Sequence, residues 1–168
     1  MLTRELEETL NLAVEEAVRH KHEFVTLEHL LFALLEDTSA RDILFNCGAQ
    51  IDELARALEE YFDNVLEKMP ADVKTMPELT STFQSTISYA VLQAEGSGQG
   101  AVDGCNILAA LYQAEQSYAV YLLLQQGISR LDILNYISHG ISKIEHDDPF
   151  PMFEGGDDEE FDPAGTGS

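Results

Sequence analysis

A short segment near residue 20 holds the side chains whose types could do chemistry. It reads His20-Lys21-His22-Glu23, and imidazole and carboxylate groups are common zinc ligands. His20, His22 and Glu23 are therefore weak candidates for a metal site. Their spacing matches no closed zinc site and no cysteine lies nearby, so the alternative is a helix end at which histidines meet the negative end of the helix dipole. We expect adventitious binding of a divalent ion at most, and no functional metal centre.

A second pair of polar residues, Glu28-His29, opens an apolar run. A histidine in this context is more typical of a packing residue than of a ligand. Glu28 lies in the first turn of a predicted helix, and together with an exposed Glu23 it is expected to form a local acidic patch. A purely solvated helix face would have the same sequence, so the residues alone leave both interpretations open.

Motifs of nucleotide-binding and hydrolytic enzymes are absent from the sequence. There is no GxxxxGK[ST] loop, no CxxC, no HExxH and no GxSxG. The glycines at 96, 98 and 100 follow a predicted helix, which indicates an inter-helix turn and not a phosphate loop. We expect no nucleotide site, no cofactor and no catalytic residue in this chain.

The charge balance limits the classes of partner. The 168 residues contain 9 Lys and Arg against 31 Asp and Glu, a formal net charge of −22. Such a surface repels nucleic acid and anionic membranes and favours basic partners. No apolar run is long enough for a membrane span, the first residues do not resemble a signal peptide, and Cys47 and Cys105 are expected to be reduced thiols. These features are typical of a cytoplasmic protein.

Helical periodicity and an internal repeat predict the architecture. Helices are expected over residues 3–20, 26–36, 40–47 and 52–62, with Thr3 as an N-cap and Gly48 as a left-handed residue after a helix. A shift of 77 residues aligns residues 2–34 with residues 79–111, for example Ala13 with Ala90. We predict an all-α fold of two pseudo-symmetric four-helix repeats, about 1–64 and 79–144, packed as one eight-helix domain at 1–144. Residues 145–168, with nine acidic residues and no basic one, are expected to be a flexible acidic tail.

Three stretches point to a family. They are the string His22-Glu23-Phe24-Val25-Thr26-Leu27-Glu28-His29-Leu30-Leu31, the string Ser129-Arg130-Leu131-Asp132-Ile133-Leu134-Asn135-Tyr136-Ile137-Ser138-His139-Gly140, and the opening Glu5-Leu6-Glu7. With these the chain, over about residues 1–143, resembles the amino-terminal repeat domain of the Clp-type AAA+ unfoldases, and the ClpA branch in particular.

This resemblance implies a non-catalytic domain on a hexameric ATPase ring that feeds the ClpP peptidase in the bacterial cytoplasm. It also implies a partner, the ClpS-type adaptor, which delivers protein substrates with destabilising amino-terminal residues. The isolated domain is expected to be a monomer. The adaptor-binding positions that the resemblance implies are Glu23, Val25, Thr26, Glu28, Pro77 and Glu78.

Two other functions remain open. The first is a direct receptor for unfolded or modified substrates, which needs an exposed apolar groove such as one between the repeats. The related ClpC-type domain binds phosphoarginine through a Thr-x-Glu-His in both repeats, but here the second repeat has Asp103-Gly104-Cys105-Asn106, which disfavours that twin-site mode. The second is a metal-dependent hydrolase that uses the histidine cluster. The acidic Thr-x-Glu-His occurs only in the first repeat, so we expect the docking surface there.

Overall fold

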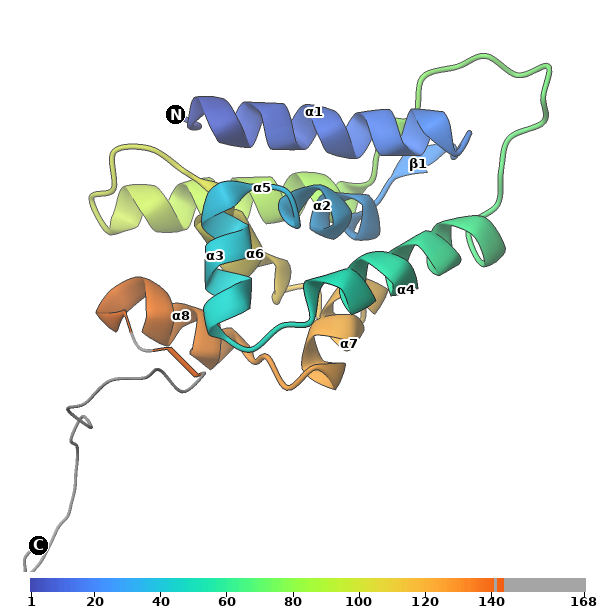
Figure 1. Cartoon of the computed structure of the whole chain (residues 1–168). Helices are drawn as coiled ribbons and strands as arrows, with labels where there is room; N and C mark the ends of the chain where they lie inside the picture. Colours follow the sequence, from blue (N-terminus) through green and yellow to red (C-terminus); the bar gives the residue numbers. More distant parts are fainter. Residues whose placement is uncertain (141, 144–168) are drawn as a thin grey trace, which may run out of the picture.

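Eight helices and one pair of short strands form in the part of the chain that this computed structural model describes, residues 1–140 and 142–143 (Figure 1). The first half contains α1 (Arg4–Arg19), β1 (Phe24–Val25), α2 (Leu27–Leu34), α3 (Thr38–Asn46) and α4 (Ile51–Asn64). The second half contains β2 (Glu78–Leu79), α5 (Ser81–Gly96), α6 (Gly104–Leu111), α7 (Tyr118–Gln125) and α8 (Arg130–His139). The predicted fold class is confirmed. The predicted tail lies outside the described residues, and the limits of the two repeats stay a prediction.

Helix starts and ends follow from local side-chain chemistry. The Oγ1 of Thr3 accepts a hydrogen bond from the backbone N–H of Leu6 at 3.1 Å. In the second repeat, Thr80 does the same for Phe83 at 3.0 Å. Both satisfy a backbone donor that has no partner inside the helix. Gly48 has a φ of 89°, as predicted for a residue that ends a helix in the left-handed region.

The two repeats exchange strand contacts in a symmetric way. β1 pairs with β2 in parallel, and an equivalent parallel bridge joins Leu2 to Val102. Thr80 donates its backbone N–H to the Val25 carbonyl at 3.1 Å, and Thr3 donates to the Val102 carbonyl at 2.9 Å. The donor and the acceptor of one bond each lie 77 positions from their counterparts in the other bond. The residue before the first helix of each repeat is therefore held by the strand segment of the other repeat.

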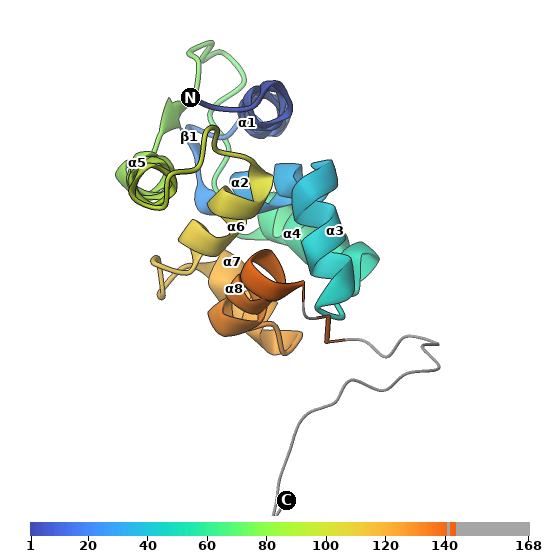
Figure 2. The ribbon, with the colours of Figure 1, turned by 90° about the vertical axis from the view of Figure 1, so that its left-hand side faces the viewer.

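The first helices of the two repeats, α1 and α5, are also arranged symmetrically. The axes of α1 and α5 run in roughly parallel lines and in opposite directions, and Figure 2 looks along both. The short helices α2 and α6 contact each other inside the bundle. Their apolar side chains supply half of the largest fully buried side chains, and each buried leucine or isoleucine stabilises the fold by about 1.5–3 kcal/mol. These fully buried side chains include Leu30, Leu31, Leu34, Ile107, Leu108 and Leu111.

Both cysteines are free thiols, as predicted. Desolvation by burial raises the pKa of Cys47 to about 11 and that of Cys105 to about 12, so both thiols stay protonated near neutral pH. Among the described residues, no helix combines the length and the apolar character that crossing a membrane requires.

Candidate docking surface

The strand pair brings together two acidic residues that are far apart in the sequence. The chain leaves α1 through Lys21, whose φ of 60° lies in the left-handed region, and then enters β1. The backbone N–H of Glu78 donates to the carbonyl of Glu23 at 3.0 Å, and Phe24 pairs with Glu78 in the strand register. Glu23 and Glu78 both have exposed side chains. The two acidic positions that the resemblance implied at separate places in the chain are thus neighbours.

Large apolar side chains are also exposed on these two strands and just before β2. The side chains of Phe24, Met76 and Leu79 are 43%, 70% and 40% exposed. We call Glu23, Phe24, Met76, Glu78 and Leu79 the docking patch. The sequence analysis did not identify its three apolar members, because a hydrophobic residue beside a helix start is ordinarily assigned to the core. These three residues lie in or next to two very short strands. Such strands have little room to bury both faces, and this could have indicated that some of the apolar residues are exposed.

Three other predicted positions lie beneath this surface or beside it. Val25 is fully buried. Thr26 is the N-cap of α2, with its Oγ1 accepting from the backbone N–H of His29 at 3.5 Å. Pro77 is half-buried and immediately precedes β2. These residues fix the course of the strands and offer little side-chain surface of their own.

Glu28 occupies a different place from the one expected. Glu28 is only 6% exposed, and its Oε2 accepts a hydrogen bond from the backbone N–H of Ala119 at 2.8 Å. Ala119 lies in the first turn of α7, where backbone N–H groups and the helix dipole favour a carboxylate. The expectation that Glu28 forms an exposed acidic patch with Glu23 is therefore wrong. Its partner lies in the other repeat, which is why the sequence did not show it.

The equivalent position in the second repeat explains the missing acidic residue there. Cys105 takes the place of Glu28, and its Sγ contacts the carbonyl of Ser39 at 3.4 Å. The preceding Gly104 lies against the side chain of Asp37, so close that an added Cβ would overlap the carboxylate. Asp37 is almost fully buried and accepts hydrogen bonds from the Oγ1 of Thr9 at 2.8 Å and from the first turn of α3. Gly104 and Cys105 thus pack against the start of α3, while Asp103 and Asn106 form the capping box of α6.

The histidines near the patch form a hydrogen-bonded relay. The backbone N–H of Thr26 donates to Nδ1 of His29 at 2.9 Å, so this nitrogen carries no proton. The Nε2–H of His29 then donates to Nδ1 of His22 at 2.8 Å, and the Nε2–H of His22 donates to the carbonyl of Phe62 at 3.0 Å. The relay is complete only when both imidazoles are neutral.

Burial favours the same neutral state. Desolvation, together with the smaller effects of the neighbouring His22 and His20, lowers the pKa of His29 to about 3. Desolvation also lowers the pKa of His22, opposed in part by the hydrogen bond to the Phe62 carbonyl. The relay joins the segment before β1, the first turn of α2 and the end of α4, so it supports the base of the docking patch.

The three weak metal candidates do not share a site. Both ring nitrogens of His22 are used in the relay, while His20 faces Glu16 and Asp63 at 3.2 and 3.4 Å. Within residues 1–140 and 142–143, no three side chains of the metal-ligating types converge. Of the three, only His20 lies at a helix end, as the C-cap of α1.

A comparison with known families settles what this arrangement belongs to. The family described as the Clp repeat (R) N-terminal domain matches residues 1–126. The chain belongs to this family. A ClpA homolog protein of Fuscovulum blasticum is similar to it, with 32% identity over 139 residues, which is 82% of this chain and 18% of that protein. The chain therefore spans about a fifth of the length of this relative, and the Clp repeat domain is ClpA-like, as the sequence strings indicated.

Solved structures show the same fold. The N-domain of ClpV from Vibrio cholerae is 21% identical, with a TM-score of 0.68 over 84% of this chain and 87% of that one. A complex of a ClpV N-domain with a VipB peptide is 20% identical, with a TM-score of 0.66 over 84% and 89%. Clp repeat domains are non-catalytic parts of AAA+ proteins, and this chain contains no ATPase module. In the ClpV complex, a domain of this fold binds a peptide from another protein.

Proposed function

We propose that this Clp repeat domain docks a ClpS-type adaptor on the docking patch and so delivers substrates to an unfoldase. The observation that carries the proposal is the strand register that places Glu23 beside Glu78, with Phe24 and Leu79 exposed on the same strand pair. Apolar side chains with charges at their rim are the usual composition of a protein-binding surface. In the full-length protein, the ATPase ring and the ClpP peptidase of a bacterial cytoplasm would receive the substrate.

The chemistry of the patch describes the adaptor face that would fit it. Two carboxylates require Lys, Arg or backbone N–H donors opposite them, and the apolar members require an apolar contact between those donors. The net charge of −22 would speed the approach of a basic face, and this contribution falls with added salt. Glu28 does not belong to this set, because its carboxylate is used inside the fold.

Calorimetric titration with a ClpS-type adaptor tests the proposal. Glu23→Lys combined with Glu78→Lys is expected to weaken binding by roughly tenfold or more, because two favourable charge contacts become repulsive. The matched control is Glu53→Lys with Glu60→Lys, the same change in net charge at two exposed positions on α4. Equal affinities for the two double variants would contradict the assignment of the patch.

The apolar part of the patch has its own test. Phe24→Ser removes an exposed aromatic ring from the patch, and we expect it to weaken adaptor binding without changing the circular dichroism spectrum. Leu131→Ser serves as the control, because Leu131 is 64% exposed on α8, away from the strands. A Phe24 variant that binds as tightly as the Leu131 variant would limit the contact to the charged residues.

A further inference from the structure

The histidine relay holds β1 at both of its ends. His22 lies two residues before Phe24, the first residue of β1, and Thr26 is the first residue after the strand. His29 joins these two flanking residues, because it bonds the ring of His22 at 2.8 Å and the backbone N–H of Thr26 at 2.9 Å. The short strand is therefore anchored before and after by one set of hydrogen bonds.

The carbonyls of this anchored segment hold the second strand of the docking patch. The Glu23 carbonyl accepts the N–H of Glu78 at 3.0 Å, and the Val25 carbonyl accepts the N–H of Thr80 at 3.1 Å. Both are backbone bonds. The position of Glu78 relative to Glu23 thus depends on the course of β1 and of the two residues that flank it.

The relay cannot take up a proton and keep all of its bonds. Nδ1 of His22 accepts the Nε2–H of His29, and Nδ1 of His29 accepts the Thr26 N–H. A proton on Nδ1 of His22 would set two N–H donors against each other. If His29 changes tautomer to accept that proton, it carries a hydrogen on its own Nδ1 and loses the bond from the Thr26 N–H. In either case one anchor of β1 is broken.

The charged and titratable groups that face His22, besides His29, come from the end of α1, from α4 and from the connector after it. They are His20, Asp63 and Lys68. The ring of His20 stacks on that of His22 with centroids 5.3 Å apart, and it lies 3.2 Å from Glu16 and 3.4 Å from Asp63. Burial is the main cause that lowers the pKa of His22, with smaller effects of the same sign from His20 and Lys68 and an opposing one from Asp63. The relay is therefore neutral at pH 7 and is protonated only on acidification.

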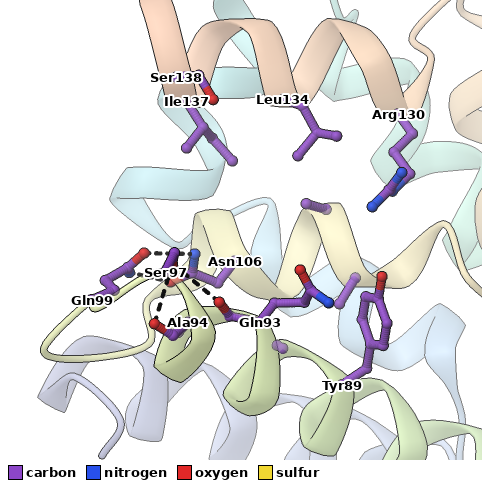
Figure 3. Close-up of a pocket in the computed structure, with 13 residues that line it drawn as sticks. Tyr89, Gln93, Ala94, Ser97, Gln99, Asn106, Arg130, Leu134, Ile137 and Ser138 are labelled. Atoms are coloured by element: carbon purple, nitrogen blue, oxygen red, sulfur yellow. Dashed lines mark hydrogen bonds between the residues drawn. The ribbon is translucent and has the colours of Figure 1, made fainter.

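The second repeat contains the same relay built from amides. A shift of 77 residues places Gln99 at the position of His22 and Asn106 at that of His29. Figure 3 shows the hydrogen bonds between these two side chains, in which Nε2 of Gln99 donates to Oδ1 of Asn106 at 2.6 Å. The same oxygen accepts the N–H of Asp103 at 2.9 Å. Neither amide titrates, so a proton can act only on the relay of the first repeat, beside the docking patch.

We propose that the histidine relay makes adaptor docking pH-dependent, with His22 as the positioning residue. A proton taken up at His22 breaks one anchor of β1, the bonds from β1 to Glu78 and Thr80 loosen, and the two carboxylates of the docking patch lose their fixed spacing. The effect on docking rests on the proposed function, whereas the loosening of β1 does not. Because the intact relay excludes the proton, docking is strongest above pH about 6.5 and weakens as the pH falls below it.

Hydrogen exchange of the chain alone tests the loosening of β1. The Thr80 N–H bonds the Val25 carbonyl beside the histidine relay, and the Thr3 N–H bonds the Val102 carbonyl beside the amide relay. These two bonds are equivalent, and each threonine follows a leucine, so their intrinsic exchange rates are similar. From pH 7.5 to 5.5, the protection of Thr80 should fall roughly three- to tenfold relative to that of Thr3. A constant ratio would overturn the proposal.

Calorimetric titration with a ClpS-type adaptor tests the effect on docking. The double variant His22→Gln, His29→Asn copies the amide pair of the second repeat and so has a relay that does not titrate. From pH 7.5 to 5.5, the wild type should lose roughly three- to tenfold more affinity than this variant. Titration of the adaptor itself cancels in the comparison. Equal losses in the two proteins would overturn the proposal.

A third variant identifies the imidazole at which the proton acts. His20→Gln removes the ring that lies outside the relay, and its loss of affinity on acidification should equal that of the wild type. A loss as small as that of the amide variant would place the proton at His20 and overturn the proposal. A wild-type chain that binds no adaptor at pH 7.5 would contradict the proposed function, and the exchange ratio of Thr80 to Thr3 would still decide whether the relay controls β1.

Discussion

The carboxylate of Glu28 and the backbone N–H of Ala119 are joined by a 2.8 Å hydrogen bond that crosses from the first repeat to the second. The donor lies in the first turn of α7, so the bond also places a negative charge at the positive end of a helix dipole. Glu28 is the acidic residue of the Thr-x-Glu-His sequence. In this domain it serves to hold the two repeats together.

Removing this carboxylate should destabilise the domain. Glu28→Ala leaves the Ala119 N–H buried without a partner, which costs about 1–3 kcal/mol of unfolding free energy. Glu28→Gln keeps an acceptor oxygen and should lose less. Urea denaturation followed by circular dichroism measures both, with Glu53→Ala at an exposed site of α4 as the control. A Glu28→Ala variant as stable as this control would show that the hydrogen bond contributes nothing.

Acidification should weaken the fold through the histidine relay. The unfolded chain binds a proton at each histidine below pH about 6.5, whereas folded His29 binds one only near its lowered pKa of about 3. The unfolding free energy is therefore highest above pH 6.5 and falls as the pH drops toward 3. His29 alone accounts for a loss of about 2 kcal/mol between pH 7 and pH 5.

Urea titrations at those two pH values provide the measurement. The double variant His22→Asn, His29→Gln lacks the relay, and its stability should depend on pH less steeply than that of the wild type. Because the carboxylates titrate in both proteins, their contribution cancels in the difference. Identical pH slopes would argue against buried neutral imidazoles.

The contact between Gly104 and Asp37 should make position 104 intolerant of any side chain. Gly104→Ala places a methyl group against the buried carboxylate, and we expect a loss of about 1–3 kcal/mol from overpacking. Gly100→Ala is the matched control, because nothing lies within 4 Å of a Cβ there. Differential scanning calorimetry compares the two. A melting temperature of Gly104→Ala that equals that of Gly100→Ala would mean that α3 and α6 separate at little cost.

A stacked pair of tyrosines links α4 of the first repeat to α7 of the second. The rings of Tyr61 and Tyr118 lie 4.6 Å apart with an interplanar angle of 13°. A double-mutant cycle with leucine at both positions should give a coupling energy of about 0.5–1.5 kcal/mol. The same cycle on Tyr61 and Tyr89, which have no ring contact, should give a value near zero. Equal couplings in the two cycles would contradict a specific stacking contribution.

The helices and their repetition could be predicted because they depend on residues close together in the chain. Thr3 caps a residue three positions away, and Gly48 ends a helix by its own conformational freedom. The apolar periodicity needs only one helix to be recognised. For the same reason the two-residue strands β1 and β2 were not predicted, since they are too short to show an alternating pattern and are held by bonds between the repeats.

The sequence by itself therefore determined the fold class, the duplication and the family of this domain. Only the tertiary structure decided which polar residues are available at the surface. It buried Glu28 against Ala119 and placed Glu23 beside Glu78. Exposure and pairing depend on side chains that folding brings together from distant positions, and no local pattern in the chain encodes them.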